Sequence, residues 1–335
     1  MDTTVAIVAY EAAGCIGDCL DSLLQLQSHG GELEILVVDG CSGDATPDIV
    51  RRYGDRVRLI SNPGRTIASN RNVALREAKS PWIAFTDADC VVPVYWLATL
   101  AREFERLQTE DPRVAGVGGG NQMRESRQQG FPLALDVALN SFLGSLGSVQ
   151  GRRFTRQRPV GSLAGLNVLY RREALTAVGG FDEELRNMCE DADINYRLGR
   201  TGWHMYFIPD VEVEHRARPT LTEWCRNMLA YGRGRARIMR KHKTIFRPVY
   251  LLPVLFMPVL LAATALGFVW PWAFAVWLYV PCLFLAGCGL ALKANRVGKG
   301  PLVGFILLAT QACYAVGLWQ GFFKGYDGNL TLPPE

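Results

Sequence analysis

Two acidic residues at the end of an apolar run are the first candidates for chemistry in this chain. The run Pro81-Trp-Ile-Ala-Phe is followed directly by Thr86-Asp87-Ala88-Asp89. An apolar run that stops in carboxylates predicts a buried strand that carries both acids at its carboxyl end. In open α/β sheets, ligands bind at that end of the strands. Carboxylate oxygens are hard ligands, so this motif predicts a site for Mn²⁺ or Mg²⁺ with a bound diphosphate.

Other polar residues follow apolar or helical segments in a similar way. Asp39 ends the run 34–39, Glu190 and Asp191 open a predicted helix over 190–200, and His215 follows Val211-Glu-Val-Glu214. Acids in a first helical turn also suit the helix dipole, and this structural alternative has more weight for Glu190 than for Asp191. His215 is either a metal ligand, where imidazole suits Mn²⁺ better than Mg²⁺, or a hydrogen-bonded structural histidine.

The elements that must position these residues alternate along the first part of the chain. Apolar runs at 5–10, 34–39, 57–61 and 82–86 predict strands, and apolar residues at helical spacing predict helices at 16–26, 46–53 and 67–78. Continuous apolar strands between amphipathic helices predict an α/β fold with a doubly wound parallel sheet. Further along we expect a strand end at 114–120, a helix over 131–146, a basic loop at 151–158, a strand-like segment within 160–170, and two short strands within 205–215.

The last part of the chain has a lipid-like composition. Segments 249–270, 272–292 and 302–323 are apolar and free of acids, and each is near the ~20 residues that cross a bilayer core. Basic residues precede the first segment and separate the second from the third, whereas the link between the first and second carries no charge. Positive loops stay cytoplasmic, so we expect a cytoplasmic N-terminal domain and an external C-terminus if all three segments cross. A re-entrant third segment would reverse the last point.

We therefore divide the chain into a cytoplasmic domain over 1–245, of which 219–245 is a basic juxtamembrane helix, a membrane domain over 246–325 and a short tail over 326–335. The apolar start of the chain is too short for a signal peptide and lacks a basic leader. The nine cysteines show no CxxC pair and no zinc spacing. The net charge of +4 comes largely from the juxtamembrane cluster, which predicts contact with anionic membrane lipid and no binding of nucleic acid. The expected location is the inner (plasma) membrane, with several spans.

The order of these motifs resembles the family 2 glycosyltransferases. The parts are the strand end Val8-Ala9-Tyr10, Asp39 within Val-Val-Asp-Gly-Cys-Ser-Gly-Asp, Asn62-Pro-Gly64 followed by Ser69-Asn-Arg71-Asn72, Asp87-Ala-Asp89, and Cys189-Glu190-Asp191. The resemblance covers roughly residues 4–216, and Gly40 stands where the family often has a second acid. It implies the GT-A fold and transfer of a sugar from a nucleotide donor with inversion. The expected fold class is thus a GT-A α/β domain with a mixed or parallel sheet, followed by C-terminal transmembrane helices.

The resemblance also implies a role for each motif. Asp39 would accept hydrogen bonds from uracil, Arg71 would contact the diphosphate, and Asp87 would face the ribose or an ordered water. Asp89 would hold the metal, with His215 as a further ligand, and Asp191 would be the general base, with Glu190 as its catalytic neighbour. A helix cap or a turn acid for Asp39 and a surface position for Arg71 are the structural alternatives, and Asp44 is expected to act as a cap. The residues expected to contact the nucleotide sugar are Ala9, Tyr10, Glu11, Asp39, Asn62, Gly64, Arg71, Asp87 and Ala88.

Two further segments are expected on the acceptor side. Gly165 and Asn167 lie in a segment that resembles the part of the site below the acceptor sugar, for which a plain turn is the alternative. The run Tyr231-Gly-Arg233-Gly-Arg235-Ala-Arg237 stands where processive members carry Gln-x-x-Arg-Trp, and it resembles the succinoglycan-type exopolysaccharide glucosyltransferases. Arg233 and Arg235 would bind a lipid-linked pyrophosphate, or serve only as a cytoplasmic topology anchor.

The function that the resemblance implies is transfer of a hexose, expected to be glucose from UDP-glucose, to a polyprenyl-diphosphate-linked saccharide. The product would enter an exopolysaccharide or another cell-envelope glycan, alongside other glycan-assembly enzymes. Three alternatives remain at this stage: transfer to a polyprenyl monophosphate, a nucleotidyltransferase that makes the nucleotide sugar, and a non-catalytic scaffold that binds it.

Overall fold

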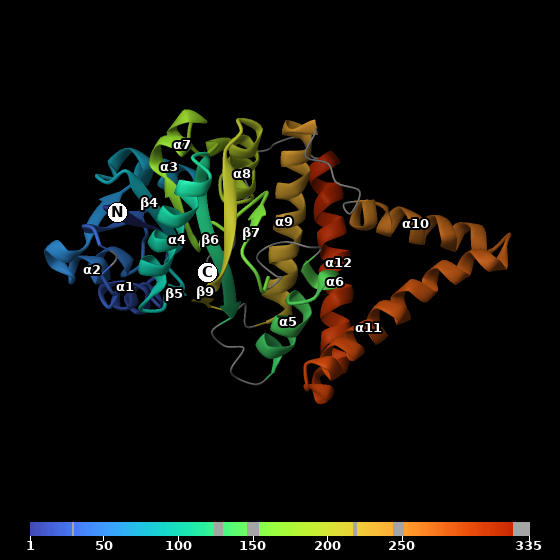
Figure 1. Cartoon of the computed structure of the whole chain (residues 1–335). Coiled ribbons are helices and arrows are strands. Elements are labelled where there is room, and N and C mark those ends of the chain that lie inside the picture. The colour runs from blue at the N-terminus through green and yellow to red at the C-terminus, as the bar shows by residue number, and fades with distance from the viewer. Residues whose placement is uncertain (29, 124–129, 146–153, 217–219, 244–250, 324–335) are drawn as a thin grey trace. The chain divides into compact units, whose positions relative to one another are not determined.

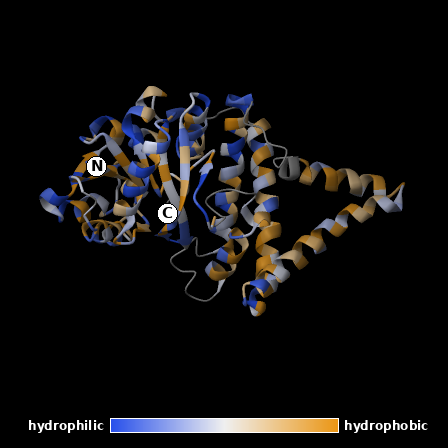
Figure 2. Ribbon diagram, viewed as in Figure 1, coloured by the Kyte–Doolittle hydropathy of each residue, from blue (hydrophilic) through white to orange (hydrophobic). Residues whose placement is uncertain are grey.

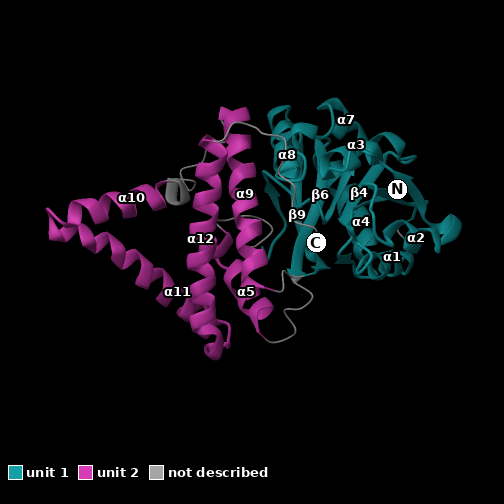
Figure 3. Ribbon diagram, turned by 180° about the vertical axis from the view of Figure 1, so that it is seen from behind, with its two compact units in different colours: residues 1–122, 153–216, 331–335 teal, residues 123–152, 217–330 magenta. Residues whose placement is uncertain are grey.

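The computed structural model describes residues 1–28, 30–123, 130–145, 154–216, 220–243 and 251–323 (Figure 1). The first part of the predicted basic loop at 151–158, the start of the predicted helix at 219, the start of the first apolar segment and the tail over 326–335 lie outside these residues. The chain forms two compact units, one of Met1–Gln122, Arg153–Arg216 and Thr331–Glu335, the other of Met123–Arg152 and Ala217–Leu330 (Figure 3). Residues 123–152 and 217–245 thus belong to the second unit, whereas the predicted division falls at 245.

The first unit is built on a nine-stranded mixed sheet with the order β3-β2-β1-β4-β8-β6-β9-β5 and with β7 paired to β9. Strands β1 (Thr3–Ala9), β2 (Leu33–Asp39), β3 (Arg58–Ser61) and β4 (Trp82–Asp87) pair in parallel, as predicted. Antiparallel pairs involve the remaining strands, which are β5 (Cys90–Val91), β6 (Val114–Met123), β7 (Arg158–Val160), β8 (Val168–Arg171) and β9 (His204–His215). The prediction of two short strands within 205–215 is wrong, because β9 is one strand that pairs with both β5 and β7.

Helices cover both faces of this sheet because the side chains of its strands alternate between two apolar cores. Ile35 and Val37 of β2 join one core with helices α1 (Ile16–Leu24), α2 (Thr46–Arg51) and α4 (Trp96–Glu110). Leu36 and Val38 join the other core with α3 (Ile67–Glu77), α7 (Arg172–Ala177) and α8 (Glu190–Arg200). Short 3₁₀ turns lie at Gly54–Arg56 and Glu183–Leu185. The central strands are therefore buried on both sides, and a binding site must form from the loops at their ends.

The described part of the second unit is helical. It contains α5 (Phe131–Leu139), α6 (Phe142–Ser145), α9 (Leu221–Lys241), α10 (Leu251–Gly267), the 3₁₀ segment η6 (Pro271–Leu278), α11 (Tyr279–Lys293), the 3₁₀ turn η7 (Val297–Lys299) and α12 (Gly300–Phe323). The predicted single helix over 131–146 is two helices, since α5 ends at Leu139 with Asn140 as its C-cap, and the Ser141 hydroxyl accepts a hydrogen bond from the Gly144 amide. Figure 2 shows the apolar character of α10, α11 and α12.

Two stretches in the described residues, Pro271–Lys293 and Val297–Phe323, are long and apolar enough to cross a membrane by length and composition. The described part of the first predicted span is shorter, with its apolar helix over Leu255–Gly267. The described C-terminal residues therefore contain two candidate membrane-spanning helices.

Candidate active site

The carboxyl ends of three neighbouring parallel strands bring the predicted acids to one edge of the sheet. β1 lies between β2 and β4, with Ala9 in register with Asp39 and Val8 in register with Asp87. Asp39 and Asp87 therefore flank the end of β1, at the edge where folds of this kind bind ligands. Tyr10 follows at the same edge with an exposed ring, whereas Ala9 and Ala88 are buried. Contacts of these two alanines with a donor would be made by the backbone.

The turn after β2 is organised by Asp39. One Asp39 carboxylate oxygen accepts a hydrogen bond from the Ser42 amide at 3.0 Å, and the other accepts one from the Ser42 hydroxyl at 2.5 Å. The same hydroxyl accepts a hydrogen bond from the Glu11 amide, and the Glu11 carboxylate accepts one from the Gly43 amide. Glu11 and Cys41 adopt left-handed backbone conformations, with φ of 50° and 58°. Asp39 is almost fully buried in this turn. Each carboxylate oxygen has a second lone pair, which can accept a further hydrogen bond from a ligand.

Asp44 has a structural role, although the N-cap residue of α2 is Ala45 and not Asp44. Its carboxylate accepts hydrogen bonds from the Ala13 amide at 3.0 Å and from the amide of Thr46, the first residue of α2, at 2.9 Å. Burial opposes these bonds, but they keep the pKa of Asp44 below its ordinary value. Asp44 therefore joins two turns and is not a site residue.

The loop after β3 is held by Asn62. Its amide nitrogen donates to the Ser69 hydroxyl at 3.0 Å and to the Asn70 side-chain oxygen at 2.8 Å, and its side-chain oxygen accepts from the Gly64 amide. A Cβ atom on Gly64 would lie 2.3 Å from the Ser69 oxygen, so the turn requires glycine at this position. The structure thus brings Asn62 and Gly64 together next to α3, with Asn62 buried and Gly64 exposed.

Arg71 links two of the predicted catalytic regions. Its Nη1 lies 2.8 Å from Oε1 of Glu190, and its Nη2 lies 3.3 Å from Oδ1 of Asp87. The guanidinium is buried and lies 5.6 Å from the ring centroids of both Phe85 and Phe181. The surface position considered for Arg71 is therefore wrong. A direct contact with a diphosphate is also not what this geometry favours, because both ends of the guanidinium already face carboxylates.

Gly165 completes the enclosure of Arg71. A Cβ atom at this position would lie 2.3 Å from Nη1 and 2.5 Å from Nη2 of Arg71. The absence of a side chain therefore lets the backbone approach the guanidinium, which is a steric reason for glycine. The Gly165 amide also points to Oδ2 of Asp191 at 3.4 Å. Gly165 thus connects the Arg71 cluster with the predicted general base.

Asp191 lies in the first turn of α8 and is partly exposed, whereas Glu190 is buried. The residue before them, Cys189, has a left-handed backbone with φ of 64°, a conformation that non-glycine residues seldom adopt. Backbone strain of this kind clusters at functional sites. The turn directs Glu190 inward to Arg71 and leaves Asp191 partly exposed.

Asn167 is a correction to the sequence analysis. Its side chain is fully buried, and its Nδ2 donates to the carbonyl oxygens of Gly120 at 2.7 Å and Val211 at 3.0 Å. Its Oδ1 accepts from Trp96 Nε1 at 2.8 Å. Both donors of the amide are used and its oxygen is occupied within the core, so Asn167 joins β6, β9 and α4 and does not reach an acceptor.

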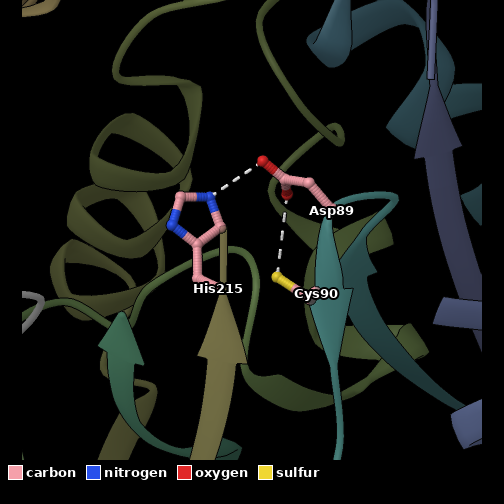
Figure 4. A group of neighbouring side chains, drawn as sticks. All are labelled: Asp89, Cys90 and His215. Carbon is pink, nitrogen blue, oxygen red and sulfur yellow. Dashed lines mark hydrogen bonds and ion pairs between the residues drawn. The ribbon is translucent and has the colours of Figure 1, made fainter. Parts of the chain in front are cut away.

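Asp89, Cys90 and His215 form a group of possible metal ligands (Figure 4). One ligand atom from each of the three lies within 4.8 Å of the others. The Asp89 carboxylate is 3.1 Å from Nε2 of His215, and Cys90 is in register with His215 across the β5–β9 pair. Two ligands at about 2.1 Å and at right angles around one cation stand about 3 Å apart, so Asp89 and His215 fit adjacent positions in such a shell.

Acidic residues dominate the electrostatics around Arg71. Burial raises the pKa of Glu190 from 4.5 to about 7. The positive charge of Arg71, which Glu190 shares with Asp87, lowers this pKa, but by less than burial raises it, and the negative charge of Asp191 raises it further. Burial also raises the pKa of Asp87, where Arg71 opposes the shift and Asp89 reinforces it. One buried guanidinium thus faces several carboxylates, and this excess of negative charge favours a cation nearby.

Sequence reasoning missed Cys90, Phe85, Phe181 and Ser42. Cys90 could have been noticed because it follows Asp89 directly, and the role of Ser42 because this residue belongs to the motif that contains Asp39. The two aromatic rings had no sequence signal, since Phe85 was an ordinary apolar residue of β4 and Phe181 belongs to a distant loop. The predicted acceptor residues Arg233 and Arg235 lie on α9 in the second unit, where Arg233 Nε donates to Gln320 Oε1 at 2.8 Å.

The chain is similar to known proteins in sequence and in fold. The family model described as Glycosyl transferase family 2 matches residues 4–179. The succinoglycan biosynthesis protein ExoA of Rhizobium meliloti (strain 1021) is 29% identical over 293 residues, which cover 85% of this chain and 84% of that protein. The N-acetylglucosaminyl-diphospho-decaprenol L-rhamnosyltransferase of Mycobacterium tuberculosis (strain ATCC 25618 / H37Rv) is 30% identical over 212 residues, which cover 56% of this chain and 68% of that protein.

Among solved structures, the chain is similar to the mannosyltransferase PcManGT from Pyrobaculum calidifontis in complex with GDP-Man and Mn²⁺. The TM-score is 0.58 and the identity 23%, with 96% of this chain and 87% of that chain covered. At this identity the likeness concerns the fold, and it confirms the predicted GT-A architecture.

Proposed function

We propose that this chain, which belongs to glycosyl transferase family 2, is a membrane-anchored, metal-dependent inverting hexosyltransferase. Its donor would be a UDP-sugar, with glucose as the first candidate, and its acceptor a polyprenyl-diphosphate-linked saccharide. The product would enter an exopolysaccharide or another cell-envelope glycan. The observation that carries the proposal is the convergence of Asp87, Glu190 and Asp191 on Arg71 and Gly165, beside the Asp89–His215 pair.

The donor side of the site is formed by the loops after β1, β2 and β3. Asp39 reads the base with the lone pairs that Ser42 does not use, and the exposed Tyr10 ring lines the same edge. Asp87, at the end of β4, faces the ribose. The polar network around Asn62 fixes the loop that carries Gly64, so the backbone at this position is preorganised for the donor.

Asp89 and His215 are the residues that would hold a divalent cation. Their spacing supports this assignment, and the similar solved structure contains Mn²⁺. When bound, the cation supplies charge stabilisation to the leaving diphosphate. The same solved structure holds GDP-Man, whereas the uridine donor is proposed here from the resemblance of the Asp39 motif to the family's nucleotide-binding turn.

Asp191 acts on the acceptor. It takes the proton of the acceptor hydroxyl while the hydroxyl oxygen bonds to the anomeric carbon, and the bond from that carbon to the diphosphate oxygen breaks. A single displacement of this kind inverts the anomeric configuration and needs one base and no protein nucleophile. Arg71 holds Glu190 and Asp87 in place through its two nitrogens, so it is a positioning residue.

The proposed acceptor is supported by the names of the relatives. The rhamnosyltransferase is named for a diphospho-decaprenol sugar. A second relative, from Methanococcus voltae, is 21% identical over 98% of both chains and is named for a dolichyl sugar phosphate. The candidate apolar helices of the second unit would keep the enzyme beside such a lipid.

A transfer assay with purified protein in membranes, a panel of radiolabelled UDP-sugars and extracted lipid acceptors tests the proposal. We expect label in a lipid-linked saccharide, a loss of about 10²–10⁴-fold in kcat for Asp191→Asn, and an unchanged affinity for the donor. Glu173→Gln, at an exposed acid in the first turn of α7, is the matched control and should retain activity. Label on a polyprenyl monophosphate with full turnover of Asp191→Asn would refute the hydroxyl acceptor, and label that stays entirely in the UDP-sugar would refute the transferase.

A further inference from the structure

Helix α12 is enclosed by its neighbours although it is as apolar as a membrane span. It contacts α5, α9, α10 and α11, and 50% of its candidate span is buried, against 17% for Pro271–Lys293. Five of its side chains are completely buried or nearly so: Val303, Ile306, Leu307, Ala315 and Leu318. A helix that faces lipid on most sides would expose these apolar residues, so α12 has the environment of a core helix.

The second half of α12 is covered by α9, which runs parallel to it. Trp224 Nε1 donates to Thr310 Oγ1 at 2.8 Å, and Arg233 Nε donates to Gln320 Oε1 at 2.8 Å. The two bonds are nine residues apart on α9 and ten residues apart on α12, in the same direction along both helices. Two polar side chains of α12, Thr310 and Gln320, therefore have hydrogen-bond partners on α9.

Glycines bring the backbones of these two helices close together. A Cβ atom on Gly232 would lie 2.3 Å from the Tyr314 carbonyl oxygen, and one on Gly317 would lie 2.2 Å from the Leu229 carbonyl oxygen. Close approach of this kind is typical of helix pairs with small residues at the interface. α9 and α12 are thus one tightly joined pair over their common length.

The first half of α12 is covered by α11 and α5. A Cβ atom on Gly287 of α11 would lie 2.4 Å from Cα of Gly304, and Tyr279 donates a hydrogen bond to Gln311. These contacts run in opposite directions on the two helices, so α11 is antiparallel to α12. Apolar residues of α5 share one cluster with this part of α12: Ala134, Leu135, Ala138, Val303, Ile306 and Leu307.

Both α5 and α9 are tied by the chain to the first unit. Residues 123–152, which contain α5, separate two segments of that unit in the sequence, and only residues 217–220 separate Arg216, the end of the second of these segments, from α9. Four residues span at most about 14 Å, which is less than half of a bilayer core. α9 also carries six basic residues, Arg226, Arg233, Arg235, Arg237, Arg240 and Lys241. Charged side chains are costly inside a membrane, so the helix that covers the second half of α12 does not belong there.

Helices α10 and α11 have the opposite character. Their connection and outer faces expose large apolar residues, among them Leu261, Phe268, Trp270, Trp272 and Leu285. The connection is uncharged and rich in tryptophan, which favours the membrane interface. The two ends of this hairpin that lie away from its tip are basic. Arg240, Lys241 and Lys243 precede it, and Lys293, Arg296 and Lys299 follow it. Basic residues at both ends and an uncharged tip indicate a hairpin that crosses the membrane and returns to the side from which it started.

We infer that the α10–α11 hairpin crosses the bilayer twice and that α12, paired with α9, lies at the membrane surface on the side of the first unit. The occupant of the exposed apolar hairpin surface is the bilayer itself, with anionic headgroups at its basic ends. The end of α12 thus stays on the side of the N-terminal unit, in contrast to a chain with three spans. This inference rests on the membrane anchoring in the proposed function.

Cysteine labelling of the full-length protein tests the topology. W272C at the hairpin tip, K299C at its base and F323C at the end of α12 are expressed in a bacterial host, and spheroplasts are treated with a membrane-impermeant maleimide. We expect at least tenfold more labelling of W272C than of the parent protein in intact spheroplasts, and labelling of K299C and F323C only after lysis. Labelling of F323C in intact spheroplasts would establish a third crossing, and labelling of W272C only after lysis would exclude the crossing hairpin.

A second readout covers the case in which F323C fails to fold. A fluorescent protein fused after residue 335 should fluoresce, and alkaline phosphatase at the same place should be inactive; active phosphatase would overturn the inference. Sugar transfer is measured on the same membranes. External labelling of F323C with transfer retained would refute only the topology, whereas the expected labelling without transfer by the parent protein would refute only the proposed function.

Discussion

Arg71 Nη1 lies 2.8 Å from Glu190 Oε1 in a buried ion pair that joins α3 to the start of α8. The other end of the guanidinium reaches Asp87 at the end of β4. One side chain therefore fixes the acids of two motifs that are more than a hundred residues apart in sequence, and the geometry of the site depends on it.

We expect Arg71→Ala to destabilise the protein strongly. The change leaves Glu190 and Asp87 without their common partner, and breaking a buried pair costs about 3–5 kcal/mol. The melting temperature in detergent checks this. Arg76→Ala, at the exposed end of the same helix, is the control and should change the stability by less than about 0.5 kcal/mol. A melting temperature of Arg71→Ala equal to that of the control would show that the pair adds nothing to stability.

The raised pKa of Glu190 makes stability depend on pH. The folded protein holds the Glu190 proton up to about pH 7, whereas the unfolded chain releases it near 4.5. Because the folded state binds more protons between these values, the contribution of this group to stability is fully present below about pH 4.5 and is lost as the pH rises through about 7. Glu190→Gln cannot titrate. Thermal unfolding from pH 5 to 8 should show the parent protein losing stability relative to Glu190→Gln, and a constant difference across this range would contradict the assigned direction.

Two histidines at opposite ends of β9 provide a matched test of the metal site. His215 lies 3.1 Å from Asp89, whereas His204 lies 2.7 Å from Asp111, which is not among the site residues. We expect His215→Gln to raise the Mn²⁺ concentration for half-maximal transfer about tenfold or more, since a ligand to the cation is replaced by a poorer one. His204→Gln should leave this concentration unchanged. Equal Mn²⁺ curves for the two variants would identify His215 as a structural histidine.

Arg233 and Arg235 should act on the acceptor side. Replacement of both with alanine removes guanidinium groups suited to a lipid-linked pyrophosphate. The expected result is an increase in the apparent KM for the lipid acceptor of about tenfold, with the KM for the UDP-sugar changed less than twofold. Arg226→Ala, at an exposed position of the same helix, is the control. An equal increase in both KM values would mean that the two arginines only support the fold.

The sequence predicted the parts of the site that depend on local pattern. The ends of β2 and β4 were predicted from apolar runs that stop at Asp39 and Asp87, and α8 from its periodicity and acidic first turn. Side-chain partners across the sheet could not be predicted in this way. His215 meets Asp89 only because β9 pairs with β5, and Arg71 is buried only because Phe85, Phe181 and Gly165 enclose it. Asn167 was misassigned for the same reason, since a polar residue beside glycines gives no sign that the core uses its amide.

The apolar segment 302–323 illustrates a related limit. Its length and composition are those of a membrane span, and its own sequence does not show that α9 covers its second half. The glycines of both helices allow their close approach, but the sequence does not show that these glycines face each other.

Calorimetric titration of UDP, with and without Mn²⁺, into the parent protein and Asp89→Ala is the most direct test of the account. Its central claim is that the carboxylate after β4 holds a cation that binds the diphosphate of an activated sugar. We predict binding of UDP to the parent protein in Mn²⁺ that weakens at least tenfold when Mn²⁺ is omitted or Asp89 is replaced. UDP affinity that is the same in all three conditions, or no binding of UDP by the parent protein in Mn²⁺, would contradict the claim.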